Sequence, residues 1–257
     1  MTTEQHLAER GIHHIILIEK ENTGSTNTDA KQYIEAASPE NPVLITAETQ
    51  TGGRGRQGKQ FSSPKGGLYM TLAVKHDSAF ADAVRITAAA AVAVSRAIRS
   101  VCDLSCEIKW VNDIYAGGKK LCGILTEAVN DYEKGITEYL IIGVGVNISE
   151  FPEGINATSL FAELGKIIDK NTLCAEITAE LLTLLCAIKK GDFSYMDDYR
   201  RLSCVIGKDI VCFQNGEAFT ARATGIDDDG GLLVTYSDGR CGTLSSGEIT
   251  LRFADMP

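Results

Sequence analysis

The sequence after Gly207 has a pattern that sharply limits the fold. Short runs of alternating apolar and polar residues follow one another there, separated by turns that contain glycine. The turns are Asn215-Gly216, Asp229-Gly230-Gly231, Asp238-Gly239 and Ser246-Gly247, and the runs between them span 210–213, 218–226, 232–236, 240–244 and 248–252. Turn chemistry this regular is typical of a small β-barrel. We therefore predict a small barrel over residues 205–257, preceded by a larger unit over residues 1–204.

The larger unit combines helical and strand patterns. Segment 79–101 is rich in alanine and places Ile86, Val94 and Ile98 at roughly helical spacing, which predicts a long buried helix. Further helices are predicted at 25–37, 173–189 and 195–202, and strands at 14–18, 43–47, 68–74, 107–110, 114–116, 120–128 and 138–146. Because many of these strands follow one another through short turns, we predict an α+β fold with a mixed, largely antiparallel sheet and flanking helices.

Composition bounds the class of protein. The chain has 257 residues, a net charge of −9 and 44% hydrophobic residues. No apolar run reaches 18 residues and the N-terminus lacks the apolar segment of a signal peptide, so we expect no membrane span and a cytoplasmic location. Eight cysteines are scattered without Cys-x-x-Cys pairs, which favours buried free thiols over a disulfide framework or a zinc site.

Residues 52–59 form a run of glycines and cations, Gly-Gly-Arg-Gly-Arg-Gln-Gly-Lys. Glycines let the backbone approach a ligand, and Arg54, Arg56 and Lys59 can donate charge-assisted hydrogen bonds to phosphate or carboxylate. Gln60 stands where a nucleotide P-loop needs serine or threonine, which argues against a P-loop. The negative net charge opposes an extended nucleic-acid surface. An anion-binding loop is predicted, with a flexible arginine-glycine loop as the alternative.

Three further segments carry polar groups that packing alone does not require. They are Ser25-Thr26-Asn27, Lys109-Trp110-Val111-Asn112-Asp113 followed by Lys119-Lys120-Leu121-Cys122-Gly123-Ile124, and Gly143-Val144-Gly145-Val146-Asn147. Glycines within the last of these predicted strands indicate that something packs against bare backbone. Taken singly, each segment also has an ordinary structural interpretation, such as a helix cap, a turn or a hairpin tip.

Together, in this order, the segments resemble the biotin protein ligase family over almost the whole chain. The shared patterns are the Gly-Arg-Gly-Arg-x-Gly loop, Lys-Trp-x-Asn-Asp, Lys-Leu-x-Gly-Ile and Gly-x-Gly-x-Asn. Val111 departs from the family's usual proline and Phe61 from its common tryptophan. The helix-turn-helix of the family's repressor members has no room before Gly11, so the form without a DNA-binding domain is expected. The resemblance also implies a class II synthetase-like catalytic fold and an SH3-like C-terminal barrel.

The resemblance implies a reaction in two steps. Biotin and ATP would form biotinyl-5′-AMP and pyrophosphate, and a lysine of a biotin carboxyl carrier protein would then accept the biotinyl group. ATP, Mg²⁺ and biotin would take part as substrates and activator, with no tightly bound prosthetic group. An exposed sheet edge near the loop could pair two subunits. No nucleic-acid or membrane partner is expected.

Individual residues acquire roles from the same resemblance. Catalysis would rest on Lys120, Arg54, Arg56 and Asp113, with Asp113 as the Mg²⁺ ligand. The biotin site would comprise Ser25, Thr26, Gln50, Gly53, Arg54, Arg56, Lys120, Gly123 and Gly143. The nucleotide site would comprise Arg56, Lys59, Phe61, Asn112, Lys120, Asn147 and Arg252. Two other functions stay open: a lipoate or octanoate ligase or transferase of the same catalytic fold, and a binding protein that senses biotin without catalysis.

Overall fold

The structure is a computed structural model. It describes the chain except residues 80–82, 150–155, 215–216, 246–249 and 254–257, and it leaves the side chains of 77–79, 214 and 250–253 undescribed as well. The predicted turns at 215–216 and 246–247, and the start of the predicted strand at 248, therefore lie outside the described residues.

A seven-stranded sheet forms the centre of the larger unit, with strand order β1-β2-β3-β7-β6-β5-β4. The strands are β1 Ile16–Thr23, β2 Val43–Gln50, β3 Leu68–Ala79, β4 Glu107–Lys109, β5 Asp113–Ala116, β6 Lys119–Asp131 and β7 Ile136–Val146. Only β1 and β2 pair in parallel, and all other neighbours in this sheet are antiparallel. This confirms the predicted mixed, largely antiparallel sheet, although β1, β2, β3, β6 and β7 are longer than predicted and β1 begins at Ile16 instead of residue 14.

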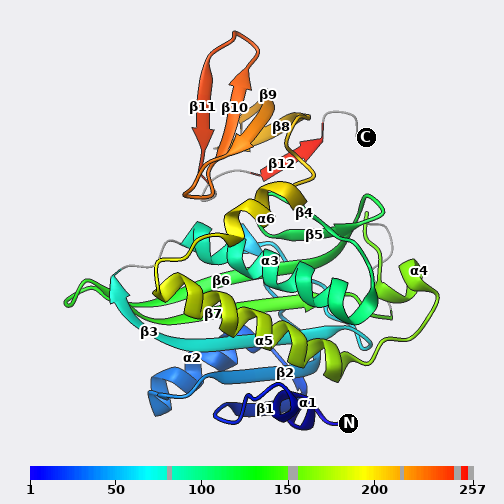
Figure 1. Cartoon of the computed structure of the whole chain (residues 1–257), viewed down its shortest axis with the longest axis vertical. Helices are drawn as coiled ribbons and strands as arrows, with labels where there is room; N and C mark the ends of the chain where they lie inside the picture. The colour runs from blue at the N-terminus through cyan, green and yellow to red at the C-terminus, as the bar shows by residue number, and fades with distance from the viewer. Residues whose placement is uncertain (80–82, 150–155, 215–216, 246–249, 254–257) are drawn as a thin grey trace.

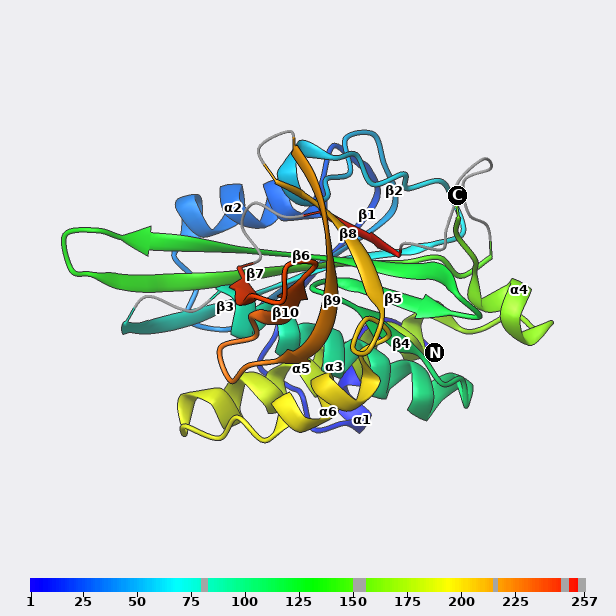
Figure 2. The same ribbon diagram turned by 90° about the horizontal axis from the view of Figure 1, so that it is seen from above.

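Helices cover both faces of this sheet (Figures 1 and 2). They are α1 Thr3–Glu9, α2 Thr26–Ala37, α3 Ala83–Cys102, α4 Leu160–Leu164, α5 Lys170–Lys189 and α6 Tyr195–Leu202. Figure 2 shows α2 on one face and α3, α5 and α6 on the other. The short helices α1 and α4 were not predicted. A capping box between Thr2 and Gln5 supports α1, and the Ser159 side chain caps α4, so local polar contacts rather than apolar periodicity define both helices.

The core lies between the sheet and the layer of α3 and α5. Alanines 88–91 and 93 of α3 are buried, and such small side chains allow α5 to pack closely. Helix α5 is long and apolar enough to cross a membrane by length and composition alone. Its buried residues, including Leu173, Ile177 and Leu181, instead belong to the main hydrophobic core. All eight cysteines are free and six are buried, as predicted.

The C-terminal segment forms a separate antiparallel sheet with strand order β11-β10-β9-β8-β12. Its strands are β8 Asp209–Gln214, β9 Glu217–Ile226, β10 Leu232–Tyr236, β11 Cys241–Leu244 and β12 Thr250–Phe253. Figure 1 shows this small sheet beyond α6 and strands β4 and β5 of the large sheet. The predicted alternation and glycine turns therefore identified the small C-terminal unit.

The turn between β9 and β10 docks the small sheet onto the larger unit. The carbonyl of Gly230 accepts a hydrogen bond of 2.9 Å from the indole Nε1 of Trp110. Arg85 forms an ion pair with Asp229, and Arg200 forms one with Asp228. Both aspartates are mostly exposed, yet their ion pairs link the small sheet to the larger unit.

A buried hydroxyl links α6 to the segment that follows Trp110. The Tyr199 hydroxyl donates a hydrogen bond of 2.9 Å to the carbonyl of Val111. Tyr199→Phe leaves that carbonyl without its donor, so we expect the free energy of unfolding to fall by about 1–2 kcal/mol. Tyr33→Phe is the control, because the described residues offer its hydroxyl no hydrogen-bond partner. Equal urea-denaturation midpoints for the two variants would contradict the assigned bond.

Candidate active site

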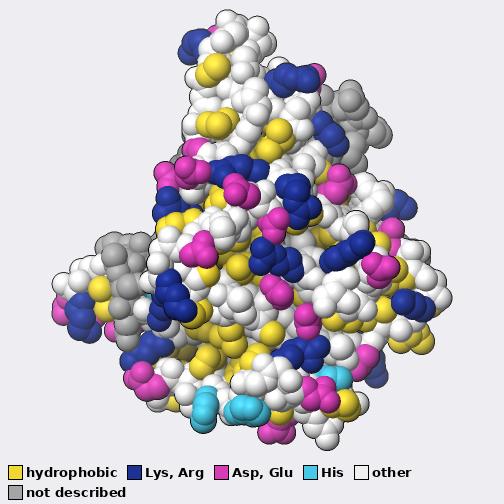
Figure 3. Space-filling model, in the orientation of Figure 1, with side chains coloured by type: hydrophobic (Ala, Val, Ile, Leu, Met, Phe, Trp, Pro, Cys, Tyr) yellow, Lys and Arg dark blue, Asp and Glu magenta, His cyan; other side chains and the backbone are white. Residues whose placement is uncertain are grey.

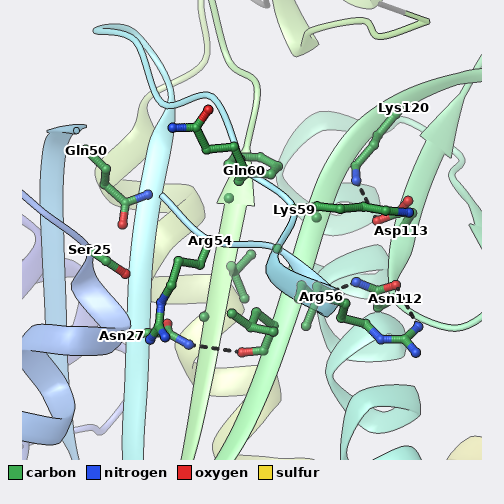
Figure 4. A pocket seen from close by; sticks show the side chains of 18 of the residues that line it. Ser25, Asn27, Gln50, Arg54, Arg56, Lys59, Gln60, Asn112, Asp113 and Lys120 are labelled. Atoms are coloured by element: carbon green, nitrogen blue, oxygen red, sulfur yellow. Dashed lines mark hydrogen bonds and ion pairs between the residues drawn. The ribbon is translucent and has the colours of Figure 1, made fainter. Parts of the chain in front are cut away.

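A cavity of about 360 Å³ opens beside the glycine loop. Figure 4 shows Ser25, Asn27 and Gln50 on one side and Asn112, Asp113 and Lys120 on the other, with the loop between them. Twelve of the fifteen predicted site residues line it: Ser25, Thr26, Gln50, Arg54, Arg56, Lys59, Phe61, Asn112, Asp113, Lys120, Gly123 and Gly143. Gly53 does not line the cavity but lies in the loop beside it. The fold thus brings together segments that are far apart in the sequence.

The glycine loop is a short hairpin that folds back on itself. Gly55 N donates to the Lys59 carbonyl at 2.7 Å, and Phe61 N donates to the Gly53 carbonyl at 2.9 Å. A 3-10 turn at Arg56–Gly58 forms the tip. A Cβ on Gly53 would lie 2.3 Å from the Phe61 carbonyl oxygen, so only glycine lets the two arms approach this closely.

Three strand glycines leave bare backbone under the cavity. Gly143 of β7 pairs with Thr71 of β3 on one side and with Leu125 of β6 on the other. The Asn27 amide lies over Gly143, where an added Cβ would be 2.1 Å from Asn27 Oδ1. Only glycine at position 143 lets the Asn27 side chain approach the strand backbone this closely.

The ring of Phe61 lies over the other two glycines. An added Cβ on Gly123 or Gly145 would come within 2.8 or 2.4 Å of the ring. The resemblance places Gly123 and Gly143 in the biotin site, and Phe61 and Asn27 occupy the space beside these two glycines in this structure. The prediction that something packs on bare backbone is thus met by the protein's own side chains.

Lys120 and Asp113 form an ion pair of 2.7 Å on the side of the cavity that also carries Asn112 (Figure 4). Both side chains are partly exposed, and Lys120 Nζ also lies 5.8 Å from the centre of the Phe61 ring. No group of three metal-binding side chains occurs among the described residues. Asp113 alone can still fit Mg²⁺, because this ion commonly takes one or two carboxylates and completes its shell with water and substrate phosphates.

Arg56 lies beside Asn112, on the same side as Asp113. Its Nη1 donates to Asn112 Oδ1 at 3.5 Å, while Asn112 Nδ2 donates to the Ile124 carbonyl at 2.7 Å. Burial lowers the pKa of Arg56, and the Asp113 charge opposes that effect. The guanidinium stays charged, since an arginine is not deprotonated in proteins. This part of the cavity therefore offers a partly buried cation beside an amide.

The opposite side is a network of neutral polar groups. Gln50 Oε1 accepts from Thr26 N at 2.9 Å and from the Thr26 hydroxyl at 3.2 Å, and Gln50 Nε2 donates to Ser63 Oγ at 2.8 Å. Ser25 occupies the N-cap position of α2 but its side chain makes no capping bond. The Ser25 hydroxyl instead lines the cavity.

Asn147 lies away from the cavity, and Arg252 cannot be compared with its prediction. Asn147 is buried, and its Nδ2 donates to the Thr158 carbonyl at 2.9 Å, which ties β7 to the segment before α4. It does not line the cavity, so its predicted contact with the nucleotide is not supported by this geometry. Arg252 lies in β12, and its side chain lies outside the described part of the chain.

Known proteins share both parts of this architecture. Residues 20–147 match the Biotin/lipoate A/B protein ligase family, and residues 206–252 match the Biotin protein ligase C terminal domain. A bifunctional ligase/repressor BirA of Bacillus subtilis is 32% identical over 250 residues, which are 91% of this chain and 71% of that protein. The chain belongs to the biotin protein ligase family.

Other members of the biotin protein ligase family agree with this assignment. A biotin--[acetyl-CoA-carboxylase] ligase of Mycobacterium tuberculosis is 29% identical over 236 residues, covering 88% of this chain and 85% of that one. The structure of the Aquifex aeolicus biotin protein ligase in complex with biotin and ATP superposes with a TM-score of 0.79 at 25% identity, over 93% of this chain and 99% of that chain.

Two residues of this chain depart from the common pattern of the biotin protein ligase family, Val111 in place of proline and Phe61 in place of tryptophan. Val111 is buried and belongs to the hydrophobic core, and its peptide bond to Trp110 is cis. Phe61, which replaces the common tryptophan, lies against glycine backbone and contacts Tyr69 edge to face, with 6.4 Å between ring centres. Both departures are therefore accommodated by packing.

Sequence reasoning missed an acidic residue at the edge of this ligase-family site. Glu127 of β6 accepts hydrogen bonds from Lys31 at 2.6 Å, Asn27 at 2.8 Å and Arg54 at 3.2 Å. Arg54 thus points to the α2 side of the cavity, whereas Arg56 points to the Asn112 side (Figure 4). The available signal was a carboxylate within a strand of mainly apolar residues, where an unpaired charge is costly.

The close approach of Asn27 to Gly143 can be tested by adding one methyl group. Gly143→Ala places a carbon in the space of the Asn27 amide, so we expect the free energy of unfolding to fall by about 1–3 kcal/mol. Gly225→Ala in β9 is the matched control, because its Cβ would make only a 3.4 Å contact with Leu233. Thermal unfolding of both variants provides the measurement. A Gly143→Ala protein as stable as the control would contradict the described packing.

Proposed function

We propose that this chain is a biotin protein ligase. It activates biotin with ATP to give biotinyl-5′-AMP and pyrophosphate, and then transfers biotin to a specific lysine of a biotin carboxyl carrier protein. The observation that carries the proposal is a single cavity in which Lys120 and Asp113 face the arginine loop across a glycine floor. Membership in the biotin protein ligase family and the Aquifex aeolicus complex with biotin and ATP support it.

The first step joins two anions. A biotin carboxylate oxygen attacks the α-phosphorus of ATP, the bond from that phosphorus to the bridging oxygen breaks, and pyrophosphate leaves. Repulsion between the carboxylate and the phosphates opposes this approach, so fixed positive charge lowers the barrier. Lys120, Arg54 and Arg56 supply that charge around the cavity. We place Lys120 nearest the reacting atoms and Lys59 near the phosphates.

Magnesium would enter with the nucleotide. Asp113 would hold Mg²⁺, and the metal would screen the charge of the leaving pyrophosphate. Asp113 also orients Lys120 through their 2.7 Å ion pair. Lys120 and the metal would therefore share one carboxylate, which couples the position of the lysine to metal loading.

The second step consumes the adenylate. The neutral amine of the carrier lysine attacks the acyl carbon, a carbon–nitrogen bond forms, the bond to AMP breaks, and the amine loses a proton. The cavity must keep water from the same carbon, and the loop across it provides cover. This chain supplies orientation and charge in this step, and the carrier supplies the nucleophile.

The two sides of the cavity suit the two substrates. Ser25, Thr26 and Gln50 present hydroxyl and amide groups of the kind that pair with a ureido ring, so we assign them to biotin. We assign Asn112 and Phe61, on the Lys120 side, to the nucleotide. The assignment of Arg252 to the nucleotide rests on the resemblance to the family alone. Gly123 and Gly143 would accept biotin beside them only after movement of Phe61 or Asn27.

Wider properties of the proposed ligase follow from its fold and chemistry. We propose a catalytic unit over 1–204 and a C-terminal unit over 205–257, working in the cytoplasm without a nucleic-acid partner. On the face that carries α3, α5 and α6, basic and acidic side chains are interspersed (Figure 3).

Strand β1 is one edge of the large sheet. It ends beside the loop, where Thr51 N donates a hydrogen bond to the Thr23 carbonyl. Because an exposed strand edge can pair with another chain, we place a homodimer contact there.

Pyrophosphate release tests the proposed activity and separates it from its relatives. We expect release from Mg-ATP with biotin and none with lipoate or octanoate. Lys120→Ala should lower kcat/KM for biotin by about 10²-fold or more, because a preorganised charge at the reacting atoms is lost. Lys119→Ala is the control, since Lys119 is an exposed neighbour outside the cavity.

Other outcomes of the pyrophosphate assay would change the function assigned to this chain. Release with lipoate or octanoate instead of biotin would move the chain to the sister activity within its matched family. Tight biotin binding without release would make it a sensor. Equal losses in Lys119→Ala and Lys120→Ala would remove the special role of Lys120.

The metal assignment predicts a change in the magnesium requirement. Asp113→Asn should raise the Mg²⁺ concentration for half-maximal pyrophosphate release by roughly tenfold or more, the size expected when a charged contact is lost. Asp198→Asn is a matched control, because its carboxylate is 29% exposed against 25% for Asp113 and pairs with arginines away from the cavity. An unchanged Mg²⁺ curve for Asp113→Asn would place the metal elsewhere.

A further inference from the structure

Glu127 is an acidic residue that accepts hydrogen bonds from three side chains, two on α2 and one on the glycine loop. Its Oε1 accepts from Lys31 of α2, and its Oε2 accepts from Asn27 of α2 and from Arg54 of the loop, at 2.6, 2.8 and 3.2 Å. The Glu127 side chain is 20% exposed, while Arg54 and Lys31 are 43% and 34% exposed. The half-buried carboxylate of Glu127 on β6 thus contacts both α2 and the glycine loop.

Asn27 carries this contact across the floor of the cavity. Its Nδ2 faces Glu127 and the Leu125 carbonyl, and its Oδ1 lies 2.7 Å from the Thr71 hydroxyl, which is also 2.8 Å from the Thr26 hydroxyl. The amide therefore spans β6, β7 and β3 directly above Gly143. Its orientation is fixed because Glu127 can accept but not donate a hydrogen bond.

The contacts continue without a break to the other arm of the loop. Thr26 reaches Gln50, Gln50 reaches Ser63, and the Ser63 hydroxyl lies 3.1 Å from the Phe61 carbonyl. Arg54 and Phe61 lie on opposite arms of the loop. The hydrogen bonds that run from Glu127 to Ser63 therefore contact both arms, and they pass along the side of the cavity that carries Thr26 and Gln50. Glu127 is the anionic end of these hydrogen bonds.

The charge of Glu127 persists in this setting. Burial alone would raise the pKa of Glu127, but hydrogen bonds from Lys31 and Asn27 and the nearby Arg54 charge outweigh burial and lower it. An ionised carboxylate stabilises two cations that would otherwise repel each other. Replacement by a neutral amide of the same size would therefore change charge and donor direction with little change in packing.

We propose that Glu127 is a positioning residue for the acid substrate, acting through Asn27 and Arg54. The inference rests on the proposed ligase function, since it assigns this side of the cavity to biotin. Glu127 makes no hydrogen bond or ion pair with Asn112, Asp113 or Lys120 among the interactions described, and these residues lie across the cavity (Figure 4). Loss of its charge should therefore weaken biotin binding and leave ATP binding nearly unchanged.

Direct binding measurements test this without requiring turnover. Isothermal titration of the full chain with biotin alone and with Mg-ATP alone would compare Glu127→Gln with the unmodified protein. We expect the Kd for biotin to rise about tenfold or more, as for the loss of a charged hydrogen-bond partner, and the Kd for ATP to change less than about twofold. Pyrophosphate release should show the same split between the two KM values.

Glu176→Gln is the matched control. Glu176 is also 20% exposed and also pairs with an arginine, Arg10, at 2.7 Å, but it lies on α5 outside the cavity. We expect biotin and ATP binding to Glu176→Gln to match the unmodified protein. Similar losses in both glutamine variants would assign the effect to general stability, and thermal unfolding of each variant would reveal such a change.

Exchange of the paired groups gives a second, independent test. Asn27→Asp should weaken biotin binding more than Glu127→Gln does, because two carboxylates would then face each other. Combining Asn27→Asp with Glu127→Gln restores an amide opposite a carboxylate and should recover part of the loss, as coupled neighbours do. Additive losses in the double variant would overturn the proposal.

Failure of the inference is distinguishable from failure of the proposed function. An unmodified protein that releases pyrophosphate with biotin, while Glu127→Gln binds biotin as tightly as Glu176→Gln does, would refute the role of Glu127 alone. An unmodified protein that neither binds biotin nor releases pyrophosphate would refute the ligase proposal first. An equal rise in the Kd values for biotin and ATP would show that Glu127 supports the whole cavity and would overturn its assignment to one substrate.

Discussion

The contact of two side chains with bare strand backbone is the constraint on which this site depends. Asn27 lies on Gly143, and Phe61 lies on Gly123 and Gly145, closer than any Cβ would permit. These contacts bring the start of α2 and the return arm of the loop down onto the sheet. The floor of the cavity is made of β6 and β7. The loop cations therefore lie around this cavity and are not spread over the protein surface. Glycine in these strands weakens local strand preference, and the packing of Asn27 and Phe61 compensates for that loss.

Charge in the cavity is arranged in two separate groups. Lys120 pairs with Asp113 on one side, and Arg54 pairs with Glu127 on the other. Each cation is therefore partly neutralised before an anion arrives, which limits mutual repulsion in a confined space. The small C-terminal sheet supports the first group indirectly, because Gly230 anchors Trp110 and Trp110 immediately precedes the segment that carries Asn112 and Asp113.

Much of this arrangement could be predicted from sequence, because its signals are local. Strand alternation, glycine turns and the alanine-rich pattern of α3 identified both sheets and the long buried helix. The resemblance to the biotin protein ligase family, carried by the four motifs, indicated the residues that were expected to form the site, and most of them line the cavity. Contacts that depend on tertiary packing could not be predicted in the same way. No sequence pattern predicts three of these contacts. They are the ion pairs of Asp228 and Asp229 with distant arginines, the hydrogen bonds of Glu127, and the hydrogen bond from Asn147 to the Thr158 carbonyl.

The central claim is that the biotin carboxylate itself attacks the α-phosphorus of ATP within this cavity. Biotin labelled with ¹⁸O in its carboxylate, Mg-ATP, the carrier protein and this chain would be incubated together, and the AMP product would be analysed by mass spectrometry. The account predicts one labelled oxygen in AMP, because the attacking oxygen remains on phosphorus when the acyl group moves to lysine. Biotinylated carrier accompanied by unlabelled AMP would contradict it.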